Sequence, residues 1–322
     1  MASVSQDNTV RVWRASDGLL LYVLAEHTNQ TSVIAFSPDG TFLATGGGCL
    51  DGYVKLWRSS DGALIRSFEA CTNGVTALVF SPDMSRLAVA GDRDEQVIKF
   101  WTLDGIQYRT LPGHPGGTGA IVFSPDGALL ASCGPLSDNI VIRNLTNVLS
   151  TTFFAHTGGL RDIAFSSSGA LLASVGRRDG RMKVFASADW SLVVSKILDG
   201  GQFVAFSQDE TVLEAGGIDR IQFWRTSNWQ ISYSDMKETY RVSSFGFSPS
   251  GACFVFGRED GTTGRFWNPQ ASPVIVTLAL KKADSDGTRR LFVQNTSRLT
   301  TITSFCKYFS KYKHFYFLTQ PI

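Results

Sequence analysis

Histidine is the side chain best suited to general acid–base chemistry near neutral pH, and the 322-residue chain contains four of them. His27, His114 and His156 fall at equivalent positions of a sequence repeat, which favours a structural role, and His314 lies in a dissimilar C-terminal segment. The sequence has no Gly-x-Ser-x-Gly, His-Glu-x-x-His or Gly-Lys-Ser/Thr motif. We therefore expect no catalytic residues and no enzymatic activity.

Two short segments could hold an ion, but neither is a complete motif. Residues 113–119 (Gly-His-Pro-Gly-Gly-Thr-Gly) could present backbone N–H groups to an anion, yet neither a lysine nor a helical pattern follows them. Residues 284–287 (Asp-Ser-Asp-Gly) begin like a calcium loop but lack its later ligands and its closing glutamate. We expect no metal ion and no cofactor.

Arginine offers the clearest binding chemistry, because its planar guanidinium group can hold a carboxylate or a phosphate through two parallel hydrogen bonds. Several arginines fall in turns, or at strand entrances, that the repeat would bring to one face of the molecule. These candidate partner-binding residues are Arg93, Arg161, Arg177, Arg178, Arg220, Arg241 and Arg258. The alternative is local pairing with acids nearby in the sequence. Those acids are Asp92, Asp94, Asp162, Asp179, Asp219, Glu259 and Asp260.

A period of about 42 residues organises most of the chain. One marker is Phe-Ser followed by a turn, and its phenylalanines are 44, 43, 42, 41 and 41 residues apart. These phenylalanines are Phe36, Phe80, Phe123, Phe165, Phe206 and Phe247. The other marker is a short alternating run, aromatic at its end in six of seven copies, which alternates with the first marker. Its copies end at Trp13, Trp57, Trp101, Arg143, Phe185, Trp224 and Trp267.

Each repeat reads as four short strands rich in Val, Ile, Phe and Trp, separated by turn residues. Residues 75–80 and 64–68 are examples of the first and fourth strands. A lone four-stranded blade cannot cover both of its faces, whereas a ring of stacked blades does so. We therefore predict an all-β fold, a seven-bladed β-propeller of four-stranded antiparallel blades whose first blade is incomplete at the N-terminus.

Over residues 1–280 these repeats resemble those of the WD-repeat family. Tryptophan ends the third strand in five of seven copies, and Gly113-His114 keeps the pair that opens a family repeat. The resemblance implies a non-enzymatic scaffold that binds a protein or peptide on the face formed by the strand 2–3 turns, and the arginines there suggest an acidic partner. Two alternatives stay open: the propeller portion of a larger multidomain protein whose activity lies elsewhere, and a propeller enzyme.

The resemblance also implies a hydrogen-bonded line across a blade, formed in the family by a His, a Ser or Thr, an Asp and a Trp. By position, the second repeat has the full set, which is His27, Thr45, Asp51 and Trp57. Other repeats depart from it. Cys71 replaces the His in the third, Arg143 replaces the Trp in the fourth, and Phe185 replaces the Trp in the fifth.

Closure of the ring is an open question, because residues 1–7 resemble the end of a second strand and no first strand precedes them. An open seam would expose strand edges. Either residues 281–322 supply the missing strand, with residues 290–294 and 299–305 as candidates, or the chain is a fragment of a longer protein. We expect a propeller over 1–280 and a basic, aromatic tail over 281–322.

The formal net charge is only +2, so no global basic field favours nucleic acid as a partner. Residues 281–322 carry eight Lys or Arg and two acids. The five cysteines are odd in number and widely spaced, as expected for reduced thiols. Neither a signal peptide nor an apolar run of membrane-spanning length is apparent. We expect a cytoplasmic protein without a membrane span.

Overall fold

The structure is a computed structural model, and the residues that it describes are almost continuous up to residue 237. They are 2–5, 8–14, 20–147, 149–198, 201–216, 220–237, 242–247, 254–258, 263–267, 276–280, 291–295 and 312–316. For residues 3–5, 220 and 233–237, and for the last six ranges, the description is of the backbone alone.

Antiparallel four-stranded sheets repeat along the chain, each strand pairing with the next. The first two of these sheets comprise β4 (Thr31–Phe36), β5 (Phe42–Gly47), β6 (Tyr53–Arg58) and β7 (Leu64–Glu69), then β8 (Val75–Phe80), β9 (Arg86–Gly91), β10 (Val97–Thr102) and β11 (Gln107–Pro112). The next three comprise β12 (Ala120–Phe123), β13 (Leu129–Cys133), β14 (Asn139–Asn144) and β15 (Ser150–Phe154), then β16 (Leu160–Phe165), β17 (Leu171–Gly176), β18 (Arg181–Ala186) and β19 (Leu192–Ile197), then β20 (Phe203–Phe206), β21 (Val212–Gly216), β22 (Arg220–Arg225) and β23 (Ile231–Lys237).

Two further sheets contain the ends of the chain. One has the order β29-β1-β2-β3, with strands Tyr312–Tyr316, Ala2–Ser5, Val10–Trp13 and Leu20–Leu24. The other has five strands in sequence order, β24 (Val242–Phe247), β25 (Phe254–Arg258), β26 (Thr263–Trp267), β27 (Val276–Leu280) and β28 (Leu291–Asn295). The described residues thus form six four-stranded sheets and one five-stranded sheet.

The strand beside β1 is not one that the sequence pattern singled out. Residues 290–294 were a candidate, but β28 instead extends the last sheet by pairing with β27. Residues 299–305, the other candidate, lie outside the described residues. The strand that pairs with β1 is β29, with Ser3 opposite Phe315. Its run of Tyr and Phe has high strand propensity, although the segment matches no repeat.

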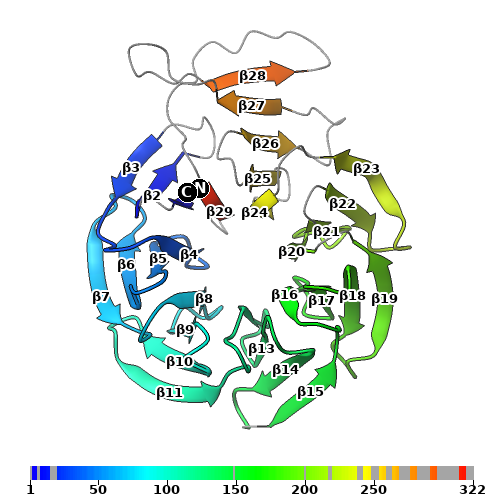
Figure 1. Ribbon diagram of the computed structural model, residues 1–322, viewed down its shortest axis with the longest axis horizontal. Coiled ribbons are helices and arrows are strands. Elements are labelled where there is room, and N and C mark those ends of the chain that lie inside the picture. The colour runs from blue at the N-terminus through cyan, green and yellow to red at the C-terminus, as the bar shows by residue number, and fades with distance from the viewer. Residues whose placement is uncertain are drawn as a thin grey trace.

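Figure 1 shows the sheets arranged in a β-propeller-like ring, with first strands such as β4, β8 and β16 nearest the middle and fourth strands such as β7, β11 and β19 outside. Apolar clusters join neighbouring sheets face to face. In one, Val54 and Leu56 of β6 pack with Val75 of β8 and Leu87 of β9. Four more clusters link successive sheets in the same way, from β1–β3 through β20–β23. Burial between sheets, rather than within one sheet, therefore stabilises the array.

The turns between first and second strands show why the repeat needs its Ser-x-Asp-Gly pattern. The Ser37 hydroxyl donates to Asp39 at 2.6 Å, and Asp39 accepts the backbone N–H of Thr41 at 3.0 Å. Gly40 then takes a positive φ of 75°, a conformation that glycine adopts without strain. Met84 occupies the same turn position in the next sheet with φ 56°, so the turn geometry survives the loss of glycine.

Within the described residues, no helix has the length and apolar character needed to cross a membrane.

Candidate functional site

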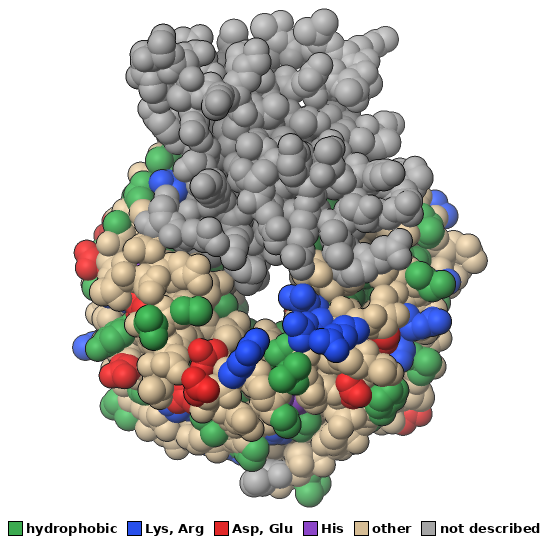
Figure 2. Space-filling model, viewed as in Figure 1, with side chains coloured by type: hydrophobic (Ala, Val, Ile, Leu, Met, Phe, Trp, Pro, Cys, Tyr) green, Lys and Arg blue, Asp and Glu red, His purple; other side chains and the backbone are tan. Residues whose placement is uncertain are grey.

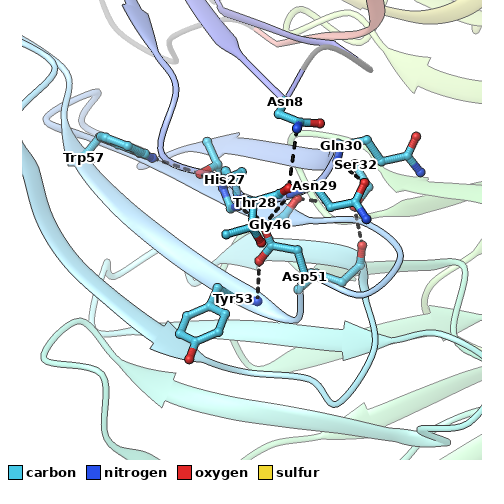
Figure 3. A network of polar contacts seen from close by, with 12 residues as sticks. Asn8, His27, Thr28, Asn29, Gln30, Ser32, Gly46, Asp51, Tyr53 and Trp57 are labelled. Atoms are coloured by element: carbon cyan, nitrogen blue, oxygen red, sulfur yellow. Dashed lines mark hydrogen bonds and ion pairs between the residues drawn. The ribbon is translucent and has the colours of Figure 1, made fainter.

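The sheet β4–β7 contains a continuous line of buried hydrogen bonds (Figure 3). His27 precedes β4, Thr45 lies on β5, Asp51 lies in the turn before β6, and Trp57 lies on β6. The Trp57 indole N–H donates to the Thr45 hydroxyl at 2.9 Å, and His27 Nε2 lies 2.8 Å from that hydroxyl. On the other side of the imidazole, His27 Nδ1 lies 3.1 Å from the Asp51 carboxylate. The structure thus brings these four residues together.

One tautomer of His27 satisfies the whole line. If Nδ1 carries the proton and donates to Asp51, Nε2 is free to accept from the Thr45 hydroxyl, whose oxygen accepts from Trp57. Burial lowers the pKa of His27, against the opposing effect of the Asp51 charge. Burial alone would raise the pKa of Asp51, but the His27 imidazole and the N–H groups of Tyr53 and Asn29 outweigh it, so that pKa is lowered. A neutral imidazole beside a carboxylate is the state that results.

The order hydroxyl, imidazole, carboxylate is also that of a hydrolase triad, but the geometry serves structure. The Thr45 hydroxyl is fully buried, and its oxygen accepts the indole N–H. A nucleophile needs an accessible oxygen beside a bound substrate. Here Asp51 accepts the backbone N–H groups of Thr28 at 2.9 Å and Tyr53 at 3.2 Å, so the line fastens two turns to the sheet.

The sheet β16–β19 repeats this line without the indole. His156 lies 2.7 Å from Asp179 through Nδ1 and 2.9 Å from the Ser174 hydroxyl through Nε2. Phe185 is buried where the tryptophan would be, and its ring packs edge-on against Phe153 with 4.9 Å between centroids. Packing thus replaces one hydrogen bond here.

The sheet β12–β15 uses an arginine in the tryptophan position. Arg143 Nη1 donates to the Ser132 hydroxyl at 2.7 Å, and His114 Nε2 lies 3.0 Å from the same oxygen. Arg143 also donates to the backbone oxygen of Pro112. Burial, followed by the Arg143 charge, lowers the pKa of His114 to about 4. The imidazole is therefore neutral at physiological pH beside a buried guanidinium.

The sheet β8–β11 has no histidine at this position. Cys71 is buried there, and burial raises the pKa of its thiol. Glu95 takes over the role of fastening the turn, because it accepts the Thr72 backbone N–H at 3.1 Å and pairs with Lys99. Among the described residues, no group of three or more His, Cys, Asp or Glu side chains is arranged to hold a metal ion.

Comparison with known families decides what these repeats are. A family model described as "WD domain, G-beta repeat" matches residues 18–58, 62–102, 105–142 and 147–185. The chain belongs to the WD-repeat family. No curated protein matches it. The matched ranges include the buried lines of His27 and His156, and also His114 and Ser132, whose partner Arg143 lies one residue beyond the third match. WD-repeat proteins are in general non-catalytic and bind other proteins.

The turns between second and third strands carry the arginines predicted to bind a partner. Arg93 is exposed between β9 and β10, and Arg178 is exposed between β17 and β18 beside the half-buried Arg177. Arg161 is exposed on β16. The turn positions predicted for Arg220 and Arg258 are wrong, because Arg220 begins strand β22 and Arg258 ends strand β25. Only the backbone of these two residues is described, and Arg241 lies outside the described residues.

The acids that could neutralise these arginines have other partners. Asp179 binds His156, and Asp162 accepts the backbone N–H of Val204 at 3.0 Å. Asp94 accepts from the Asn73 amide at 2.8 Å, and Asp92 accepts the N–H of Asp94. Over the part of the chain that the structure describes, the side chains of Arg93 and Arg178 form no ion pair or hydrogen bond. Asp219, Glu259 and Asp260 lie outside the described residues.

On the face drawn in Figure 2, Lys and Arg side chains gather beside the central opening, with hydrophobic side chains between them and acidic ones farther out. The strand 2–3 turns also expose two leucines that sequence reasoning missed, Leu50 at 80% and Leu136 at 60%. An apolar residue in an otherwise polar turn was the available signal.

Contacts between neighbouring sheets fix these turns relative to one another. Asp138, in the turn after β13, accepts the backbone N–H groups of Gly158 at 2.7 Å and Gly159 at 3.0 Å, just before β16. Arg177 Nη1 donates to the Pro135 oxygen at 3.2 Å. Between the sheets β12–β15 and β16–β19, the face is therefore a rim of turns bonded to one another rather than a set of independent loops.

Proposed function

We propose that this WD-repeat chain is a non-enzymatic scaffold that binds a protein or peptide partner on the face formed by its strand 2–3 turns. The observation that carries the proposal is a pair of exposed arginines, Arg93 and Arg178, which have no ion-pair or hydrogen-bond partner among the described residues and lie on short turns packed against neighbouring segments. Because the backbone of these turns is already ordered, binding a carboxylate has to order only the arginine side chains, whose planar guanidinium groups lose less entropy per hydrogen bond than a lysine would.

The hydrogen-bond geometry supports a structural rather than a catalytic use of the described histidines. The imidazoles of His27, His114 and His156 are buried and have their Nε2 atoms at hydroxyl groups of the same sheet. A general base must instead reach a substrate atom. We assign these side chains to holding the rim in shape.

We also infer that the seven sheets are blades of one closed ring, completed where β29 pairs with β1. β29 lies next to β24 and β25 of the five-stranded sheet and next to β4 of the sheet β4–β7. Pairing with β29 covers a backbone edge of β1 that would otherwise be open to other chains. A closed ring keeps the turns of successive blades in constant relation, as a binding face requires.

The proposal can be tested by comparing captured partners across matched variants. The double variant Arg93→Glu, Arg178→Glu reverses charge on the strand 2–3 face. The control Arg58→Glu reverses an arginine that is also exposed, at the end of β6 next to the strand 3–4 turn, where Arg58 pairs with Asp61 at 2.9 Å. Affinity capture from the source cells with quantitative mass spectrometry should show partners that are lost with the double variant and kept with the control. An unchanged partner set in the double variant contradicts the proposed face.

A further inference from the structure

Four consecutive sheets present leucine and arginine in alternation on their strand 2–3 turns. Leu50 lies between β5 and β6, Arg93 between β9 and β10, Leu136 between β13 and β14, and Arg178 between β17 and β18. These four residues, which we call the Leu/Arg arc, are exposed. Because neighbouring sheets follow one another around the ring, the arc is a curved row with one side chain from each sheet.

Leu50 combines an exposed side chain with an unfavourable backbone conformation. Its side chain is 80% exposed and its φ is +66°. A leucine rarely adopts the left-handed region, where glycine and asparagine are far more common. Its neighbour Asp51 forms a bridge to Gly74 of the next sheet and accepts the N–H of Tyr53, so the backbone is fixed. Backbone strain is common at functional sites, and Leu50 combines it with an exposed apolar side chain.

Leu136 is positioned by glycines of two neighbouring segments. A side chain at Gly116 would collide with that of Leu136, and one at Gly159 would collide with the Pro135 oxygen. Both glycines have positive φ, 73° and 92°. The Leu136 side chain therefore has a defined place although it is 60% exposed.

The two arginines of the arc also pack against glycines of neighbouring segments. The Arg178 side chain packs close to Gly158, and Gly117 packs close to the backbone of Arg93. Neither guanidinium group has a partner among the described residues. Asp138 and Asp179, in the same turns as Leu136 and Arg178, already accept hydrogen bonds from Gly158 and His156.

Resting on the function proposed above, we propose that the Leu/Arg arc docks an extended peptide segment of another protein in which acidic and aliphatic side chains alternate. Arg93 and Arg178 bind its carboxylates, and Leu50 and Leu136 contact its aliphatic side chains. A polyanion such as RNA fits less well, because Leu50 and Leu136 alternate with the two arginines and offer no hydrogen-bond donor or charge to a continuous run of phosphates.

The probe is an array of fluorescein-labelled 12-residue peptides in which Glu and Leu alternate at varied spacing. Matched arrays carry Gln for Glu, Ala for Leu, or phosphoserine for Glu, and a uridine oligonucleotide serves as a polyanion. Fluorescence anisotropy on the full chain measures each affinity. At least one Glu/Leu peptide should bind about tenfold more tightly than its Gln and its Ala counterparts, consistent with about 1.4 kcal/mol for each feature. If none binds, or if the phosphopeptides or the oligonucleotide bind instead, the proposal is overturned.

Variants then locate the binding. Arg178→Glu and Leu136→Ser should each weaken the best Glu/Leu peptide about tenfold. Arg58→Glu and Leu64→Ser, which change an arginine at the end of β6 and a leucine 41% exposed on β7, should leave it unchanged. Equal losses with the control variants would show non-specific attraction and reject the arc.

Leu50→Gly separates a binding role from a structural one. Glycine relieves the positive φ, so the melting temperature should rise while affinity for the peptide falls. A lower melting temperature with unchanged affinity means that Leu50 serves the fold, and overturns its place in the arc. If the peptides fail but partner capture still depends on Arg93 and Arg178, the peptide chemistry is wrong and the binding face stands. If both fail, the proposed function fails as well.

Discussion

At the scale of single residues, the indole of Trp57 both packs and donates. Its ring belongs to the apolar cluster between β1–β3 and β4–β7, and its N–H reaches Thr45 at 2.9 Å. We predict that Trp57→Ala lowers the free energy of unfolding by about 3–5 kcal/mol, as for other large-to-small core changes. Trp57→Phe should cost only about 1 kcal/mol, because Phe185 already fills the same position in another sheet. Urea denaturation of both variants measures this, and an equal loss for Phe and Ala would refute the dominance of packing.

Glu214 is a buried acidic residue that we expect to lower the stability of the fold. Its side chain is fully buried on β21, and neither carboxylate oxygen has a hydrogen-bond partner among the residues that the structure describes. Burial raises the pKa of Glu214 well above its ordinary value. Alanine occupies the equivalent position in four other sheets, at Ala44, Ala88, Ala131 and Ala173.

The sign of the resulting pH dependence follows from this raised pKa. Below the pKa of the unfolded chain, both states hold the proton and there is no penalty. Above it, only the unfolded state ionises freely, so stability falls until the pH passes the folded-state pKa. Glu214→Gln should therefore lose less stability than the wild type between pH 4 and pH 7, and Glu214→Ala should gain about 1–3 kcal/mol at pH 7. Denaturant midpoints at both pH values test this, and parallel pH profiles for wild type and the Gln variant would count against it.

At the scale of elements, a carboxylate from the next sheet forms hydrogen bonds to the turn between β16 and β17. Ser168 stands where other repeats have an acid such as Asp39 or Asp126. Glu210, from the turn between β20 and β21, accepts from the Ser167 hydroxyl at 2.8 Å and from the Ser168 hydroxyl at 3.0 Å. The Ser168 hydroxyl keeps the local bonds of the turn, because it lies 3.2 Å from the Ser166 hydroxyl and accepts the backbone N–H of Ala170 at 3.2 Å. The contact with Glu210 adds a link between two sheets.

This link predicts a change of sign in a double-mutant cycle. Ser168→Asp alone places a second carboxylate against Glu210 and should lower stability. In a Glu210→Ala background the same change restores the Asp turn of the other repeats and should raise stability. We expect a coupling of about 0.5–1 kcal/mol, as for groups in direct contact. Additive effects in thermal melts would contradict a Glu210 link.

The sequence predicted the elements better than it predicted their chemistry. Phe-Ser and Trp markers located the strands, because alternating apolar residues must face the neighbouring sheet. The line through His27 followed from the family resemblance. The use of Arg143 as the donor to Ser132 did not, because a buried arginine at a tryptophan position has no repeat-level signal. Leu50 and Leu136 escaped notice because exposure and φ at a turn depend on contacts between sheets that one repeat cannot reveal.

At the scale of the whole molecule, the inferred ring depends on a strand from the far end of the chain. β29 pairs with β1 in register from Ala2 opposite Tyr316 to Val4 opposite His314. Truncation after residue 305 removes β29 and leaves an unpaired edge on β1. We predict a lower melting temperature and aggregation on size-exclusion chromatography. Truncation after residue 316, which keeps β29, is the matched control and should behave as the full chain. If truncation after residue 305 leaves the melting temperature unchanged, closure through β29 is contradicted.

The central claim is that partners bind the strand 2–3 face, and amide hydrogen exchange on the full chain with a captured partner tests it most directly. Binding should slow exchange in the turns at residues 48–52, 92–96, 134–138 and 177–180, which carry Leu50, Arg93, Leu136 and Arg178. The turns at residues 37–41, 81–85 and 124–128 join first to second strands at the opposite ends of those strands, and should exchange as in the free protein. Protection of this second set, with the first set unchanged, would show that the wrong face has been assigned.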